Sequence, residues 1–207
     1  MYLPAHFTEK DEAKINAAIR ANSFATLVTF DDTAPFASHV PLVLQPDRGP
    51  RGSLIGHVAR ANPQWQHFAS GAEVLAIFQG PHAYISPSWY QTPNMVPTWN
   101  YVAVHVYGIP RVVENTAAFA EILQFTVAEY ESGRPTPWRD ELPADYKAAM
   151  MKAIVGFEIE ITRVEAKFKL SQNRKPEDIT GAAAALSRSE NQTDRALAAL
   201  MREQLEP

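Results

Sequence analysis

The sequence predicts a mainly β protein, a small β-barrel that carries helices and ends in further helices. The first half contains several short, closely spaced strand-like runs, and helix-type patterns dominate the end of the chain. With 207 residues, of which 46% are hydrophobic and 20% charged, the chain is long and apolar enough to bury a sizeable core. A globular protein rather than a disordered one is therefore expected.

Alternation of apolar and polar residues indicates the strands. They are expected at 24–30, 36–44, 53–58, 73–79, 83–86 and 99–113. The turn 31–34 joins the first two as a hairpin, and Pro41 indicates an edge position or a bulge. In the last run Val102, Val104 and Val106 alternate with other residues, as in a strand with one buried face.

Helices are predicted before, between and after these strands. They are expected at 9–20, 63–69, 116–131, from Pro143 to just before Ile154, at 176–186 and at 192–205. Thr8 and either Asn115 or Thr116 are the expected N-terminal caps of two of them. A further, half-exposed strand is expected around 157–161. We therefore expect a barrel domain over 1–170 and a helical extension packed on it over 171–207.

Composition excludes several kinds of site. The chain has no cysteine, which removes disulfides, thiolate metal sites and cysteine nucleophiles. Its six histidines do not have the spacing of a zinc motif, so no metal site is predicted. No apolar run approaches the roughly 20 residues of a membrane span, and no signal-peptide pattern is visible, so we expect a cytoplasmic location and no membrane partner.

The segment 77–108 is unusually rich in aromatic and hydroxyl side chains. Tryptophan and tyrosine combine a flat apolar body with a polar group, which suits stacking on a planar ligand. The candidate ligand residues here are Ser86, Trp89, Thr98, Trp99 and Asn100. The alternative is an aromatic core that spans two strands and their turn. The hydroxyls and the amide, where a core would have leucine or valine, favour a ligand site.

A second candidate group lies just before an expected helix, at 56–63. Arg60 and Asn62 follow a strand and precede the helix at Pro63. Backbone N–H groups at a helix start and a guanidinium group together suit a phosphate. The alternative is that Arg60 forms a surface ion pair and Asn62 caps the helix.

A third group combines cations and amides at 167–174. Lys169, Gln172 and Arg174 follow the last expected strand. The alternative is a solvated basic strand end, which is the commoner meaning of such a run.

Six segments together resemble one known family. They are MYLPAHF (1–7), SHVP (38–41), GHVARANP (56–63), YISPSWY (84–90), VPTWNY (96–101) and KLSQNR (169–174). The chain resembles the PaiB-type FMN-binding negative transcriptional regulators over about residues 1–186. The resemblance implies an FMN-binding split barrel, related to pyridoxamine-phosphate-oxidase-like flavoproteins, and a homodimer with FMN at the subunit interface.

FMN needs a binding site for its phosphate, a flat apolar slot for its ring and hydrogen-bond partners for the polar atoms of the ring. Given the resemblance, Arg60 and Asn62 could hold the phosphate, aided by the hydroxyl of Ser86 or Thr98. A cation near the pyrimidine edge would favour the anionic reduced flavin. The other candidate residues are His57, Trp89 and Trp99 for the ring, Lys169 or Arg174 for the pyrimidine edge, and Asn100 and Gln172.

Three functions remain open from the sequence. The first is a flavin-responsive negative transcriptional regulator that acts indirectly, without tight DNA binding of its own. The second is an NAD(P)H-dependent flavin oxidoreductase on the same barrel, and the third is a haem-binding or haem-degrading split-barrel protein. A shared fold does not decide among them.

Direct DNA binding is not expected. Arg188, Arg195 and Arg202 recur every seven residues near the C-terminus, but Glu190 and Asp194 lie among them. The formal net charge of −4 gives the whole molecule no attraction to nucleic acid.

Overall fold

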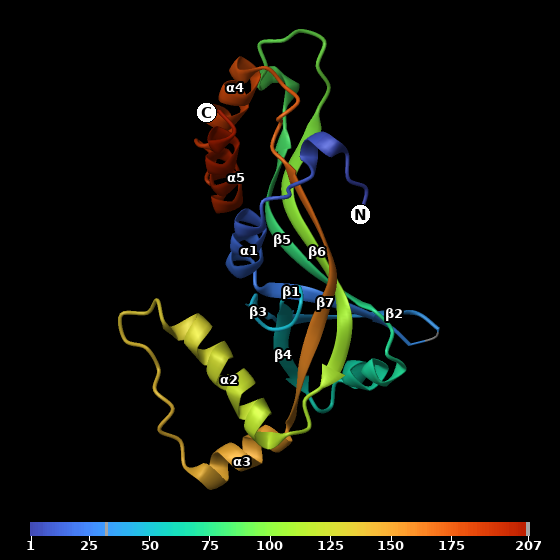
Figure 1. The fold of residues 1–207 in the computed structure, drawn as a ribbon. Coiled ribbons are helices and arrows are strands. Elements are labelled where there is room, and N and C mark those ends of the chain that lie inside the picture. Colours follow the sequence, from blue (N-terminus) through green and yellow to red (C-terminus); the bar gives the residue numbers. More distant parts are fainter. Residues whose placement is uncertain (32, 206–207) are drawn as a thin grey trace. The chain divides into compact units, whose positions relative to one another are not determined.

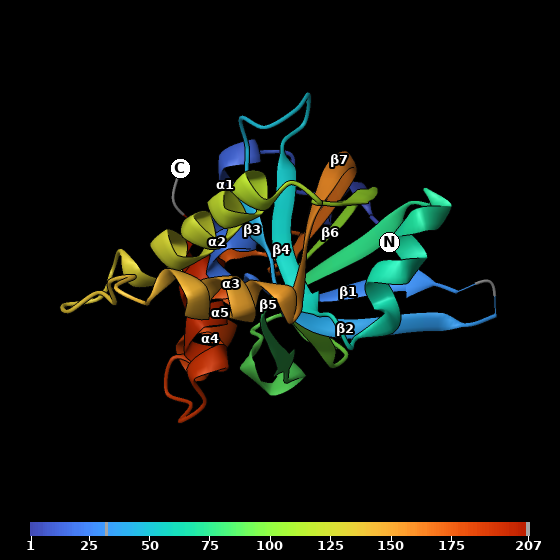
Figure 2. The same ribbon diagram turned by 90° about the horizontal axis from the view of Figure 1, so that it is seen from below.

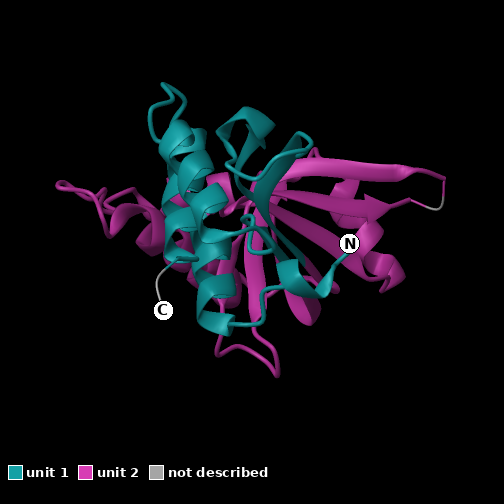
Figure 3. Ribbon diagram, turned by 90° about the horizontal axis from the view of Figure 1, so that it is seen from above, with its two compact units in different colours: residues 1–21, 79–105, 165–207 teal, residues 22–78, 106–164 magenta. Residues whose placement is uncertain are grey.

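The structure, a computed structural model, describes residues 1–31 and 33–205 as two compact units (Figure 3). Unit 1 comprises 1–21, 79–105 and 165–207, and unit 2 comprises 22–78 and 106–164. Within these described residues, seven strands are hydrogen-bonded in the order β2-β1-β5-β6-β7-β4-β3.

Three long strands, which Figure 1 labels, supply residues to both units. They are β5 (Val74–Ile85), β6 (Thr98–Val112) and β7 (Ile154–Lys169). Each is therefore described below with the unit to which its residues belong.

In unit 2, β1 (Phe24–Phe30) and β2 (Pro35–Pro41) form an antiparallel hairpin with Phe24 opposite Pro41. The sheet ends at β2, so the edge position indicated by Pro41 is confirmed. The predicted strand 36–44 is divided, because the N–H of Leu42 turns to the carbonyl of Ser23 and a separate strand β3 (Val43–Gln45) begins after it. The predicted turn 31–34 includes residue 32, which lies outside the described residues.

The remaining strand of unit 2, β4 (Ser53–Ala59), pairs with β3 and with the unit 2 part of β7. Helix α2 (Thr116–Glu131) covers β3 and β4 (Figure 2), packing Phe119 and Ile122 against them. Gly156 on β7 makes room for this packing, because a Cβ there would lie 2.3 Å from the ring of Phe119. The 3₁₀ helix η2 (Pro63–Ser70) and helix α3 (Ala144–Lys152) complete the unit.

Unit 1 contains α1 (Glu12–Ala21), α4 (Pro176–Leu186), α5 (Gln192–Glu203) and the short 3₁₀ helices η1 (Ala5–Phe7) and η3 (Pro87–Trp89). Helices α4 and α5 lie side by side (Figure 1). The helix predicted from residue 9 begins later than expected, because Asp11 rather than Thr8 accepts the first free N–H groups. Asn115, by contrast, caps α2 as predicted.

The strands predicted at 73–79 and 83–86 are one strand, β5. The chain continues through Gly80 and Pro81 without a break, and Gly80 lies close to Val102, which a Cβ would approach to 3.0 Å. The sequence was misleading here because glycine followed by proline normally marks a turn. In the described part of the chain, no helix is long and apolar enough to cross a bilayer.

Candidate functional site

The eleven candidate residues fall into two groups. His57, Arg60 and Asn62 belong to unit 2. The other eight belong to unit 1 and are Ser86, Trp89, Thr98, Trp99, Asn100, Lys169, Gln172 and Arg174.

In unit 2, Arg60 binds backbone carbonyls rather than a carboxylate. Its Nε donates to the carbonyl of Lys152 at 2.7 Å, and its Nη2 donates to the carbonyl of Ile154 at 3.0 Å. These bonds tie the end of β4 to the point where α3 ends and β7 begins. His57, half-buried on β4, has a pKa below its ordinary value because burial disfavours its charged form.

Asn62 caps η2, so the alternative interpretation of this residue is confirmed. Its Oδ1 accepts the N–H of Gln64 at 3.0 Å, and its Nδ2 donates to Ser38 Oγ at 2.9 Å. Pro63 has no N–H, and the N–H of Gln64 is already bound. The start of η2 therefore offers a phosphate fewer donors than the sequence indicated.

In unit 1, the segment between β5 and β6 presents hydroxyl and aromatic groups. Ser86 caps η3 by accepting the N–H of Ser88, and the two hydroxyls lie 2.7 Å apart. The side chain of Trp99 on β6 is 55% exposed, and its ring meets the ring of Tyr84 edge-on at 6.1 Å. Such an exposed pair of large rings is available to a ligand or a partner.

Lys169, the last residue of β7, lies at a corner of unit 1 that is rich in positive charge. Its ammonium group donates to Thr98 Oγ1 and to the carbonyl of Trp99. Burial, together with the nearby cations Lys167 and Arg174, holds the pKa of Lys169 below its ordinary value of 10.5. No ion pair within residues 1–31 and 33–205 includes any of these three cations.

Asn100 carries a buried acceptor without a donor. It lies on the buried face of β6, the face of Val102 and Val104, and is fully buried. Its Nδ2 donates to Ser171 Oγ at 2.8 Å, whereas its Oδ1 has no donor among the described residues. The hydroxyl of Tyr90 is buried and unpartnered within the same set. Such groups are rare in folded proteins because their desolvation is costly, so each calls for a partner.

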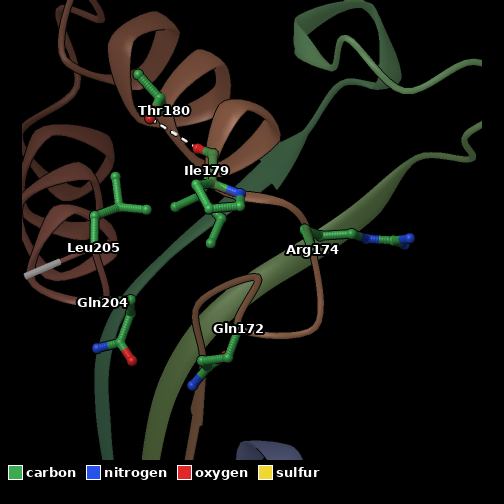
Figure 4. Close-up of a pocket in the computed structure, with 7 residues that line it drawn as sticks. Gln172, Arg174, Ile179, Thr180, Gln204 and Leu205 are labelled. Atoms are coloured by element: carbon green, nitrogen blue, oxygen red, sulfur yellow. Dashed lines mark hydrogen bonds between the residues drawn. The ribbon is translucent and has the colours of Figure 1, made fainter. Parts of the chain in front are cut away.

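Gln172 and Arg174 line a pocket of about 440 Å³ at the start of α4 (Figure 4). The other lining residues are Pro176, Ile179, Thr180, Gln204 and Leu205. Gln172 is occupied locally, since its side chain binds the backbone of Phe168 and Leu170. The guanidinium group of Arg174 points away from Gln204 and Leu205 in Figure 4. The positive charge of Arg174 would therefore contribute little to binding a ligand inside this pocket.

Asp178 on α4 was missed by the sequence analysis. Its side chain is buried, and its carboxylate accepts the Thr92 hydroxyl at 2.6 Å and the N–H groups of Gln91 and Thr92 at 2.8 and 3.0 Å. The Thr92 hydroxyl, and then the two N–H groups, hold the pKa of Asp178 below its ordinary value of 3.8. In the sequence it looks like an ordinary acidic residue in the first turn of a helix.

Unit 1 provides groups that fit FMN. The cations around Lys169 suit a dianionic phosphate or the electron-rich edge of a flavin ring, and Thr98 adds a hydroxyl. The Oδ1 of Asn100, which has no donor among the described residues, suits the N–H of a flavin ring, and the half-buried Trp89 and the exposed Trp99 offer apolar surface. Charge, hydrogen-bonding capacity and flat apolar area are thus present in one compact unit.

Comparisons with known proteins agree with this fit. Residues 1–163 match the family model described as "Putative FMN-binding domain". The chain is 40% identical to the protease synthase and sporulation protein PAI 2 of Bacillus subtilis over 207 residues, covering 99% of this chain and 98% of that protein.

Solved structures show the same fold at low sequence identity. The FAD and haem binding protein of Mycobacterium smegmatis has a TM-score of 0.60 at 14% identity, covering 84% of this chain and 78% of that one. The flavocytochrome Anf3 of Azotobacter vinelandii has a TM-score of 0.61 at 13% identity, covering 94% of this chain and 78% of that one. The predicted fold class, a flavin-binding split barrel with helices, is confirmed.

Replacing Arg60 by alanine should lower the melting temperature of the protein without FMN by a few degrees, since two bonds to backbone carbonyls disappear. Arg60 is exposed, so the loss should be about 1 kcal/mol. Thermal unfolding measures this, with the exposed Arg51→Ala in the same unit as control. An unchanged melting temperature, with FMN binding weakened and riboflavin binding unaffected, would instead assign Arg60 to the phosphate.

Proposed function

We propose that this chain, which belongs to the family described as "Putative FMN-binding domain", is a flavin-responsive negative regulator of the PaiB type. We propose that it regulates indirectly, without tight DNA binding of its own. The family assignment and the PAI 2 relative confirm the predicted resemblance and the predicted cofactor, FMN. The regulatory role is the further step. Its physical support lies in unit 1.

The observation that carries the proposal is the uncompensated charge around Lys169. Three cations, Lys167, Lys169 and Arg174, lie close enough to lower the pKa of one of them, and none has a carboxylate partner in the described residues. A bound anion would relieve this repulsion. FMN, when bound, supplies a ring that takes up and releases electrons and protons reversibly.

The residues of unit 1 would then divide the work of binding. Lys169 and Arg174 would balance the negative charge of FMN, and the Oδ1 of Asn100 would accept a hydrogen bond from it. Trp89 and Trp99 would pack against the apolar surface of the flavin ring. Arg60 and Asn62 are held by protein partners, whereas Lys169 lies among other cations, so we favour Lys169 over them as the main anion partner. The flavin contacts of His57, Arg60 and Asn62 stay a prediction.

An indirect mode of regulation is supported by how the C-terminal arginines are used. Arg195 Nη1 donates to the carbonyls of Ser189 and Glu190, and Arg202 Nη2 donates to Ser187 Oγ. Both side chains hold the connection between α4 and α5. Phosphate contacts dominate the affinity of proteins for nucleic acid. Arg195 and Arg202 already bind groups of this chain, and the net charge of the chain is −4. Both facts favour regulation that does not depend on tight DNA binding by this protein.

We further propose a homodimer with FMN at the interface between two copies. Tyr84 and Trp99 are 47% and 55% exposed and lie next to each other on β5 and β6. Large adjacent rings left in water are an aggregation hazard, which a second copy or a ligand would remove. The cytoplasmic location stays a prediction.

Lys169→Met should weaken FMN binding about tenfold, because it removes a partly buried charge from the anion partner set. Quenching of FMN fluorescence on titration measures the affinity, and riboflavin in parallel shows whether the lost partner was the phosphate or the ring. Lys175→Met, an exposed cation in the same segment, is the matched control. Equal affinity of the Lys169→Met variant and the unaltered chain would contradict the proposed site.

The visible spectrum of the purified protein separates the cofactor alternatives. Flavin bands are expected, and a Soret band would favour the haem-binding alternative. Rapid reduction of the bound flavin by NADH or NADPH at turnover rates would favour the oxidoreductase.

The isolated protein should not bind DNA tightly and specifically. A titration against labelled promoter and scrambled duplexes at about 150 mM salt should show weak binding of both, because Arg195 and Arg202 are engaged within the chain and its net charge is −4. Nanomolar binding that discriminates between the duplexes, and that falls when Arg195 and Arg202 are replaced, would overturn the indirect mode.

Sedimentation at micromolar concentration should give a dimer for the unaltered chain. Tyr84→Ser should shift the equilibrium towards monomer, because it removes apolar area from the exposed pair. Tyr146→Ser, which removes a ring of similar exposure (50%) from α3 in unit 2, is the control. A monomer for the unaltered chain would contradict the proposal.

A further inference from the structure

One turn of helix α4 holds the segment that carries Trp89 and Tyr90. The carboxylate of Asp178 binds three donors at once, the N–H groups of Gln91 and Thr92 and the hydroxyl of Thr92. Asp178 is 1% exposed, so this is a buried charge balanced by three directed hydrogen bonds. These residues are 86 and 87 positions apart in the sequence.

Two further contacts fix the same segment. A Cβ at Gly181, three residues after Asp178, would lie 2.2 Å from the carbonyl oxygen of Trp89, so the helix and the segment touch where only glycine fits. The guanidinium group of Arg174 lies over the ring of Tyr90, 5.8 Å from its centroid. The segment 89–92 is therefore held from the side of α4 at several successive residues.

Nothing in α4 itself requires this aspartate. A carboxylate in the first turn of a helix usually accepts an N–H of that helix or simply faces the positive end of the helix dipole. Lys175, at the N-cap, makes no capping bond with its side chain, yet Asp178 directs both oxygens to the other segment. The carboxylate therefore contributes more to holding residues 89–92 in place than to stabilising its own helix.

We propose that Asp178 is a positioning residue of the flavin site, which sets the place of Trp89 and Tyr90 by holding Gln91 and Thr92. This inference rests on the proposed function, since it assigns the held segment to FMN. It also means that α4, which lies beyond the matched residues 1–163, is part of the cofactor site. On this proposal the C-terminal helices supply a residue to the flavin site and do not only pack on the rest of unit 1.

The experiment compares Asp178→Ala, which removes all three acceptor contacts, with Asp178→Asn, which retains one acceptor oxygen. Glu177→Ala is the matched control, because Glu177 is the exposed neighbour in the same turn. Amide hydrogen exchange of Gln91 and Thr92 is measured without FMN, and FMN affinity is measured by fluorescence titration. Far-UV circular dichroism checks that each variant is folded.

Asp178→Ala should speed exchange of both amides about tenfold and weaken FMN about tenfold, because bonds to a buried charge are lost. Asp178→Asn should fall between it and the unaltered chain, and Glu177→Ala should change neither quantity. If Asp178→Ala does not fold, the same two measurements on Asp178→Asn decide the matter.

Unchanged exchange at Gln91 and Thr92 would overturn the holding role. Faster exchange with unaltered FMN affinity would overturn the positioning role and leave Asp178 a purely structural residue. If the unaltered chain binds no FMN, the proposed function fails and the positioning role fails with it, while the exchange rates still decide whether the aspartate holds the segment.

Discussion

Positive charge that has no carboxylate partner among residues 1–31 and 33–205 is the constraint on which the proposed site depends. Lys167, Lys169 and Arg174 lie within electrostatic reach of one another, and the pKa of Lys169 is lowered both by burial and by the other two. Three cations so placed repel one another more strongly than they would in water, because the surrounding protein screens charge poorly. The chain holds the two lysines through neutral acceptors, the carbonyls of Tyr2 and Trp99 and the hydroxyl of Thr98. An anion is the partner that these three cations lack in the part of the chain that the structure describes.

The strands explain why these groups meet. Residues two apart in a strand share a face, so β7 presents Lys167 and Lys169 together, and β6 presents Thr98 and Asn100 together. Asn100 lies on the same face as the buried Val102, Val104 and Val106, and for that reason its amide is buried. Its Nδ2 supports Ser171, a non-glycine residue with a φ of 69°. The same alternation that builds the core therefore delivers polar groups to the site.

Alternation and turn residues were enough to predict β1, β4, β6 and the edge position of Pro41, because these depend on neighbours in the sequence. Local rules failed where a distant contact decides. Gly80 and Pro81 continue β5 beside Val102, and Asp178 binds Gln91 and Thr92 rather than its own helix. The residue types of the site were predictable from chemistry, and the resemblance named the cofactor. Their hydrogen-bond partners were not, since no pattern in one sequence pairs residues 86 positions apart.

Those partners bear directly on which cation should serve FMN. A side chain that is held by protein partners has fewer donors left for a ligand, and moving it leaves the groups it held without their partner. Two of the five N–H donors of Arg60 bind the carbonyls of Lys152 and Ile154, and the Nδ2 of Asn62, its donor group, binds Ser38 Oγ. Lys169 also has protein partners, but its neighbours are cations, so an anion that approaches it removes repulsion as well as adding attraction. The cations around Lys169, together with the segment 89–92 held by Asp178, therefore suit an anionic planar ligand better than Arg60 and Asn62 do.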